Sequence, residues 1–229
     1  MVKYWRSLLH LFYPELCMGC NVALIDQEEI ICTSCLYHLP YTDFHLDSNN
    51  EAVQLLKGKF PFEFATSMLH LRSGSIVEKL IYNLKYNNHP QVGKYLGKKY
   101  GALLGESGFF NDIEVIVPIP LHPKRMMKRG YNQSQCIANG LAETMGVPVN
   151  TQLLKRGKYQ KSQTKMYRSD RISNVEDSFY CTDGEQGAAR HILLVDDVLT
   201  TGATMTAAAE ELISAIPNCK IFIVSIGRA

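Results

Sequence analysis

The 229-residue sequence lacks any long hydrophobic run, internal repeat or low-complexity tract. A membrane-spanning helix needs about 20 consecutive apolar residues, and a solenoid needs a fixed repeat period. The sequence therefore predicts neither a membrane-spanning protein nor a solenoid. Hydrophobic residues make up 46% of the chain and charged residues 20%, which is ordinary for a globular protein. The length suffices for one sizeable α/β domain with a small appendage.

A complete secretory signal is also lacking at the N-terminus. Two basic residues precede apolar ones, but His10, Pro14 and Glu15 interrupt the apolar stretch and no small-residue cleavage site follows. Residues Trp5, Leu8, Leu9 and Phe12 fit one face of a short amphipathic helix. We therefore predict a cytoplasmic protein.

The chain has little net charge, formally +2, but the charge is unevenly distributed. Residues 121–171 contain eleven Lys and Arg residues against two acidic residues, a local net charge of +9. The rest of the chain holds thirteen basic and twenty acidic residues, a net charge of −7. A basic middle section predicts contact with an anion, either a phosphate ester or a nucleic acid, although a mixed solvated surface is the simpler alternative.

Four of the seven cysteines form a paired C-x-x-C pattern near the N-terminus: Cys17, Cys20, Cys32 and Cys35. Four thiolates arranged in this way suit a closed tetrahedral zinc site, in which the metal stabilises a small module with few hydrophobic residues. Two disulfides and an iron–sulfur cluster are the competing interpretations. With four protein ligands the zinc would be structural. The scattered Cys136, Cys181 and Cys219 are interpreted as small buried residues.

Strands and helices are expected to alternate along the remainder of the chain. Strands are predicted in "FATSMLHLRS", "IEVIVPIP", "HILLVDD" and "KIFIVSI"; helices in "GSIVEKLIYNLKYNN", "HPQVGKYLGKKYGALLGES", "NQSQCIANGLAETMG" and "ATMTAAAEELISAI". This order predicts a parallel sheet flanked by helices. We divide the chain into a four-cysteine zinc-binding module, residues 1–45, and an α/β domain, residues 60–229. A linker ending at Pro61 joins them, and a basic loop runs through Arg171.

The segment 192–205, "ILLVDDVLTTGATM", carries the most specific chemistry. In an open parallel sheet, ligands bind at the carboxyl ends of strands. Asp196 and Asp197 are expected at such an end, followed by a turn that leads into a helix. The N–H groups of that turn form an anion cradle, in which Gly202 allows a close approach. Because carboxylates repel phosphate, we expect Asp196 and Asp197 to bind the hydroxyls of a phosphorylated sugar.

Residues 192–204 resemble the phosphoribosyl pyrophosphate (PRPP) signature of type I phosphoribosyltransferases. The whole chain resembles the ComF family, bacterial proteins linked to competence and DNA uptake, through the cysteine pattern, "LIYNLKYNN", "VPIPLHPKRMMKRGYNQS", "SQTKMYRSDRISNV" and "LLVDDVLTTGAT". The resemblance implies a type I phosphoribosyltransferase fold with a zinc-ribbon-like module. It assigns Asp196 and Asp197 to the ribose hydroxyls and to catalysis, if the protein is an enzyme.

The same resemblance implies a further set of substrate-binding residues. The 5′-phosphate would be bound by Thr200, Thr201, Gly202, Ala203 and Thr204. Pyrophosphate would meet Pro118, Ile119, Pro120, Lys124 and Arg125, through backbone N–H groups of the proline-rich turn and the basic side chains beside it. Arg129 belongs to "KRGYNQS", residues 128–134, which resembles the mobile substrate-binding element next to that loop; a solvated, helix-capping loop is the alternative. Mg²⁺ would accompany PRPP. Lys85, Gln163, Arg171 and Asn174 match recurrent family positions without an assigned role.

Three functions remain open at this stage. The first is a PRPP-binding phosphoribosyltransferase-like protein with a role in DNA uptake. The second is a non-catalytic accessory protein that binds single-stranded DNA through the basic segment and tyrosines such as Tyr131, Tyr159 and Tyr167, and that PRPP or a nucleotide regulates. The third is a regulator recognised by a helicase-like partner.

Overall fold

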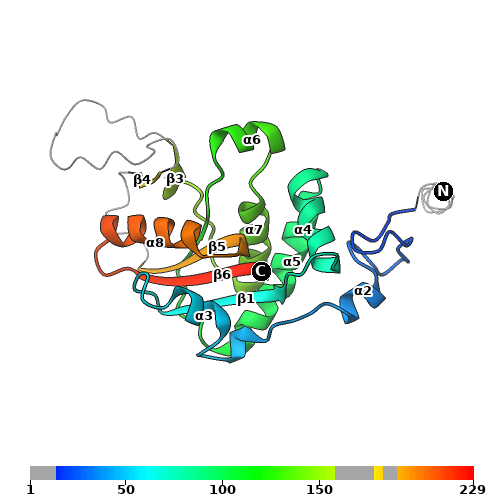
Figure 1. The fold of residues 1–229 in the computed structure, drawn as a ribbon, viewed down its shortest axis with the longest axis horizontal. Helices are drawn as coiled ribbons and strands as arrows, with labels where there is room; N and C mark the ends of the chain where they lie inside the picture. The colour runs from blue at the N-terminus through cyan, green and yellow to red at the C-terminus, as the bar shows by residue number, and fades with distance from the viewer. Residues whose placement is uncertain (1–13, 158–177, 183–189) are drawn as a thin grey trace.

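The computed structural model describes residues 14–157, 178–182 and 190–229, and its centre is a four-stranded parallel sheet (Figure 1). The strand order is β1-β6-β5-β2. The strands are β1 (Phe64–His70), β2 (Val115–Pro118), β5 (His191–Leu199) and β6 (Lys220–Arg228). The long strands β5 and β6 lie in the middle and are almost entirely buried. Burial on both faces explains why the sequence of β5 reads as an apolar run.

Three helices cover one face of this sheet. They are α4 (Ile76–Tyr86), α5 (Pro90–Ser107) and α7 (Gln133–Met145). Ser75 caps α4, as its position in the sequence predicts, by accepting a hydrogen bond from the N–H of Glu78. Helices α5 and α7 pack with their backbones in contact, because a Cβ atom on Gly97 would lie 2.2 Å from the carbonyl oxygen of Ile137. Glycine is therefore required at this crossing.

The other face is covered by α8 (Ala203–Ala215), α3 (Glu51–Leu56) and a small antiparallel pair (Figure 1). The pair consists of β3 (Leu154–Arg156) and β4 (Phe179–Cys181). Asn50 caps α3, its side-chain oxygen accepting hydrogen bonds from the N–H groups of Ala52 and Val53. Ala52 and Leu56 are fully buried in the same hydrophobic cluster as β5 and α8.

The cysteine-rich segment packs against the helices on the first of these faces, the one covered by α4, α5 and α7. It contains the short helix α2 (Thr33–Tyr37), and the 3₁₀ helix η1 (Phe44–Leu46) follows it. Cys17, Ile31 and Leu39 are buried in the same cluster as α4 and α5. The side-chain amide of Asn83, on α4, donates to the carbonyl of Met18 at 2.9 Å. The segment therefore shares its hydrophobic core with the sheet domain.

Most predicted elements are confirmed, including all four strands of the parallel sheet and the α/β class. The linker prediction is wrong for residues 44–46 and 51–56, which form η1 and α3, because so short an apolar pattern inside a polar stretch gives no clear helical period. The basic loop begins with strand β3, and a helix, α6 (Pro123–Arg129), occupies part of the expected pyrophosphate loop. Strand β5 continues to Leu199 instead of ending at the aspartates. Among the described helices, none has the length and apolar content that crossing a membrane requires.

Candidate functional site

The turn between β5 and α8 presents a row of unpaired backbone amides. Among the described residues, no hydrogen-bond acceptor is found for the N–H groups of five residues: Thr200, Thr201, Gly202, Thr204 and Met205. The N–H of Ala203 has only a long contact, 3.4 Å, with the hydroxyl of Thr201. Gly202 is the N-cap of α8, with a left-handed φ of 80°. Since α8 has 13 residues, its dipole adds positive potential at the turn.

The threonine hydroxyls extend this row of donors. Thr200, Thr201 and Ala203 are exposed, and Thr204 is half-buried in the first turn of α8. Backbone amides and hydroxyls at a helix N-terminus are suitable donors for a phosphate group. The turn can therefore bind an anion without requiring a basic side chain inside the loop.

Asp196 and Asp197 lie near the carboxyl end of β5, and Val198 and Leu199 separate them from this turn. Pairing with β2 stops at Val195, so both residues extend beyond the neighbouring strand on that side. One oxygen of each carboxylate is bound by the protein. Asp196 Oδ1 accepts from the hydroxyl of Ser134 at 2.9 Å, and Asp197 Oδ1 lies 2.8 Å from the ammonium nitrogen of Lys85.

The second oxygen of each carboxylate has no hydrogen bond or ion pair with another described residue. The Lys85–Asp197 pair lies at the edge of the sheet, where the two side chains retain 22% and 12% of their accessible surface. Both carboxylates are thus fixed in position by the protein while keeping an acceptor oxygen. This arrangement suits a ligand that offers hydroxyl donors.

The environment of Asp196 disfavours ionisation. Withdrawal of its carboxyl group from water, followed by repulsion from Asp197, raises the pKa of Asp196 to about 7. Hydrogen bonds from the N–H of Asp197 and the hydroxyl of Ser134, and the charge of Lys85, act in the opposite direction. A carboxyl group that is hard to ionise at a ligand-binding edge is typical of a functional site.

The predicted pyrophosphate turn differs from the expectation. Pro118 and Pro120 have no N–H group, and the N–H of Ile119 donates to the carbonyl of Val195 at 2.9 Å. The expectation that this turn offers the N–H of Ile119 to a ligand is therefore wrong, because sheet pairing with β5 continues one residue past β2. The residues Pro118 and Ile119 are buried.

The basic residues beyond the turn lie on α6. Lys124 and Arg125 are exposed, and α6 has no buried residue. Arg129 is more constrained: its guanidinium group donates to the side chain of Gln133 at 2.9 Å and lies 5.1 Å from the centre of the Tyr86 ring. Lys124 and Arg125 can therefore approach a ligand freely, whereas Arg129 is partly engaged in packing.

Three contributors to the site were not assigned by the sequence. Ser134 and Lys85 come from α7 and α4, and Lys59, just after α3, donates to the carbonyl of Thr201 at 2.7 Å. Lys85 had been noted as a family position, but nothing local in the sequence indicates its partner. Ser134 follows the helix cap Asn132, which is the only nearby signal. Some residues named in the sequence analysis lie outside the described residues: Tyr159, Gln163, Tyr167, Arg171 and Asn174. The same holds for residues 1–13.

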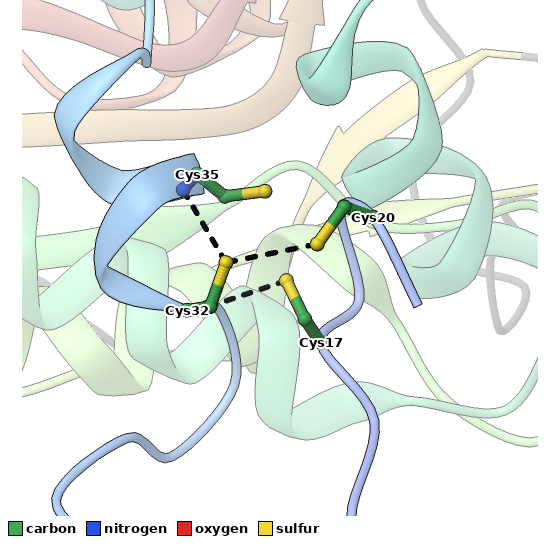
Figure 2. Close-up of side chains that lie close together, drawn as sticks. All are labelled: Cys17, Cys20, Cys32 and Cys35. Atoms are coloured by element: carbon green, nitrogen blue, oxygen red, sulfur yellow. Dashed lines mark hydrogen bonds between the residues drawn. The ribbon is translucent and has the colours of Figure 1, made fainter. Parts of the chain in front are cut away.

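The four N-terminal cysteines converge on one point (Figure 2). Their sulfur atoms all lie within 4.8 Å of one another, and Cys20 Sγ is 3.6 Å from Cys32 Sγ. Tetrahedral zinc with Zn–S bonds of about 2.3 Å needs sulfur–sulfur distances of about 3.8 Å. All four cysteines are free of disulfide bonds. The donor set and its spacing fit a structural metal site, which confirms the predicted cluster.

Backbone N–H groups favour the thiolate of Cys17, whereas burial raises the pKa of Cys35. The N–H groups of Cys32 and Gly19 point at Cys17 Sγ, at 3.2 and 3.4 Å. Burial works against ionisation, but these backbone hydrogen bonds, with further ones from Cys20, lower the pKa of Cys17 to about 7. A readily ionised thiol suits metal binding, because the thiolate is the ligand.

Comparison with known proteins supports the predicted family. The model of the phosphoribosyl transferase domain matches residues 132–229. Competence protein F of Haemophilus influenzae is 32% identical over 204 residues, which cover 87% of this chain and 85% of that protein. DNA utilization protein YhgH of Escherichia coli K12 is 26% identical over 211 residues, covering 91% and 88%.

Two further matches are more limited. Competence protein ComFC of Bacillus subtilis is 33% identical over 99 residues, 43% of this chain and 38% of that protein. Among solved structures, adenine phosphoribosyltransferase from Leishmania tarentolae matches with a TM-score of 0.39 and 13% identity, over 80% of this chain and 89% of that chain.

Proposed function

The chain belongs to the family of competence protein F and contains a phosphoribosyl transferase domain. We propose that it binds PRPP at the carboxyl end of β5, where the turn leads into α8. The observation that carries this proposal is the row of unpaired amides at Thr200, Thr201, Gly202, Thr204 and Met205, which follows two carboxylates at the end of β5. The amides would bind the 5′-phosphate. The second oxygens of Asp196 and Asp197 would accept from the ribose hydroxyls.

The opposite end of PRPP would meet basic side chains. Lys124 and Arg125 on α6 offer charge without backbone donors, and Lys85 is held beside Asp197 at 2.8 Å. Mg²⁺, bound mainly by the ligand's own oxygens and by water, would neutralise the pyrophosphate. The two oxygens that the aspartates leave unpaired are suitable acceptors for that metal's water ligands. No protein cage is needed for it.

The same arrangement suits phosphoribosyl transfer. In that reaction the bond from the anomeric carbon to pyrophosphate breaks, a bond to the acceptor's nucleophilic atom forms, and the acceptor releases a proton. The sugar ring becomes positively charged in the transition state, and carboxylates fixed nearby stabilise it without reorganising. Binding both ends of PRPP aligns the anomeric carbon with an incoming group.

Isothermal titration with PRPP and Mg²⁺ tests the proposal. We expect binding by the full chain and its loss, by at least about 100-fold, in the double variant Asp196→Asn, Asp197→Asn, since two ligand hydroxyls lose charged acceptors. Asp26→Asn is a matched control, because Asp26 is exposed in the cysteine-rich segment. An unmodified chain that does not respond to millimolar PRPP would contradict the proposal, as would unchanged affinity in the double variant.

Zinc is the metal that we propose for the four-cysteine cluster, and its role is structural. Four cysteines complete a tetrahedral shell, which leaves no position for a substrate. Unpaired thiols in this number also fit a reducing compartment such as the cytoplasm. Elemental analysis of the purified chain should give about one zinc per chain.

A second candidate function, binding of single-stranded DNA, is favoured by the surface of α4 and α6. Tyr82 and Tyr86 of α4 are 55% and 57% exposed, and their rings lie 5.1 Å apart. Arg129 covers Tyr86, and α6 carries four basic residues and no acidic one. Exposed aromatic rings beside basic residues can stack on bases while the charges meet phosphates. The names of the relatives, which refer to competence and DNA utilization, agree with such a role.

Fluorescence anisotropy with a labelled oligothymidylate tests this candidate. The double variant Tyr82→Ser, Tyr86→Ser should bind about 10-fold more weakly or worse, since base stacking on each ring is lost. Tyr37→Ser is the control, because Tyr37 is 84% exposed but lies on α2. Affinity that does not change with salt, or equal losses in the control, would contradict DNA binding at this surface.

A further inference from the structure

We propose that Lys59 and Arg228 are positioning residues that hold the β5–α8 turn with its amides directed outward, toward the phosphate of the ligand. This inference rests on the proposed PRPP site and adds two residues to it, both outside the segment 192–204. Neither residue would touch the ligand. Their targets are the carbonyl oxygens on the back of the turn.

Three successive carbonyls of the turn are approached by cationic side chains. The ammonium group of Lys59 donates to the carbonyl of Thr201 at 2.7 Å. One guanidinium nitrogen of Arg228 lies 3.4 and 3.5 Å from the carbonyls of Leu199 and Thr200, although its closest acceptor is the carbonyl of Ala229. Arg228 Nε also lies 4.0 Å from a carboxylate oxygen of Glu51. The contact of Lys59 is short and that of Arg228 is long, so Lys59 makes the larger contribution.

Because the peptide group is planar, fixing a carbonyl also fixes the direction of the N–H group that follows it. No cis peptide bond occurs in the described chain. In a trans peptide the carbonyl and the following N–H point in opposite directions. Holding the carbonyls of Leu199, Thr200 and Thr201 on one side therefore places the N–H groups of Thr200, Thr201 and Gly202 on the other. These are three of the five amides without a partner among the described residues.

The charges of the two side chains also matter. The back of the turn would otherwise expose partial negative charge, which weakens the attraction of the amides for an anion. A cation bound to those carbonyls cancels that charge and adds positive potential behind the turn. A neutral side-chain donor would hold the carbonyls in the same orientation but would add no positive charge behind the turn.

The segment that carries Lys59 lies against the turn. A Cβ atom on Gly202 would lie 2.5 Å from Leu56 Cδ2 and 3.7 Å from the ammonium nitrogen of Lys59. Leu56 is fully buried, so the end of α3 is fixed against the turn. Arg228 is held by β6, where it pairs with Leu199 of β5. Arg228 therefore approaches from a strand, and Lys59 from the turn directly after α3.

Titration of the full chain with PRPP and Mg²⁺, and separately with ribose 5-phosphate, tests this inference. Lys59→Met should weaken both ligands by roughly tenfold, since one charge-assisted hydrogen bond is lost. Lys59→Arg should restore affinity to within about threefold, because charge and donor return. Lys57→Met is the matched control: Lys57 is also exposed, two residues away, and its substitution should leave both affinities unchanged.

The outcomes separate this inference from the proposed function. If the unmodified chain binds both ligands and Lys59→Met binds them equally well, Lys59 has no positioning role and the PRPP site stands. If the unmodified chain binds neither, the site itself is wrong. A melting temperature of Lys59→Met within about 2 °C of the parent excludes general unfolding as the cause of a weaker affinity.

Discussion

The cysteine cluster and the candidate PRPP site at the carboxyl end of β5, called here the sheet-edge site, are built in opposite ways. The cluster takes all four ligands from positions 17–35, a single short segment. The sheet edge combines a local motif at residues 196–204 with Lys59, Lys85 and Ser134, which come from three distant segments. The cluster would depend mainly on the zinc that we propose, whereas the second site depends on the packing of the domain. The two should therefore fail differently when perturbed.

The largest expected effect comes from breaking the cluster. In Cys32→Ser we expect loss of the metal and a melting temperature lower by about 10 °C, because buried residues of the segment share their core with α4 and α5. Metal analysis and thermal unfolding measure both effects. Cys219→Ser, which lies outside the cluster and is half-buried, should keep the metal. Retention of zinc and stability in Cys32→Ser would refute the assignment of the cluster.

A smaller effect is expected at the turn, where packing and not a metal maintains the site. Gly202→Ala should lower the free energy of unfolding by about 3 kcal/mol, since alanine is strained at a φ of 80° and its Cβ would clash with Leu56. Denaturant unfolding measures the loss. Gly105→Ala should instead stabilise slightly, because Gly105 lies in α5 with open space around it. Equal effects of the two substitutions would mean that the turn is not constrained by α3.

The contrast also explains what could be predicted from the sequence. The cysteine spacing and the run from Ile192 to Thr204 keep their chemistry within neighbouring residues, so each was recognised directly. The alternating apolar patterns likewise predicted the strands and the helices α4, α5 and α7. These signals are local, and local signals do not require knowledge of the fold.

The missed features depend on long-range contacts. Lys59 follows α3, which reads as a polar linker because only Ala52 and Leu56 are buried in it. Lys85 looks like an ordinary basic residue in the last turn of α4, where it would favour the helix dipole. Its pairing with Asp197 spans 112 positions of the chain and appears only once α4 lies over the end of β5. The occupied N–H of Ile119 depends in the same way on pairing with β5.

The smallest expected effect concerns the two aspartates of the site and compares how Asp196 and Asp197 affect the stability of the fold. The pKa of Asp196 is raised to about 7, far above its value in an unfolded chain. A carboxyl group with a raised folded-state pKa contributes stability at low pH that is lost as the pH rises through that pKa. Asp196→Asn removes the penalty, so it should stabilise the protein by about 1–2 kcal/mol at pH 8. The gain should shrink steadily as the pH falls toward 4.

Asp197→Asn is the counterpart with the opposite sign, because it leaves the partly buried ammonium group of Lys85 without its anion at every pH in this range. Thermal unfolding of both variants at pH 5.5 and pH 8 measures the difference. Destabilisation by Asp196→Asn at pH 8 would show that its hydrogen bond with Ser134 outweighs the cost of its charge. The expected result, one aspartate that costs stability beside one that contributes it, would mark Asp196 as the residue retained for the ligand and Asp197 as the residue that also holds α4 in place.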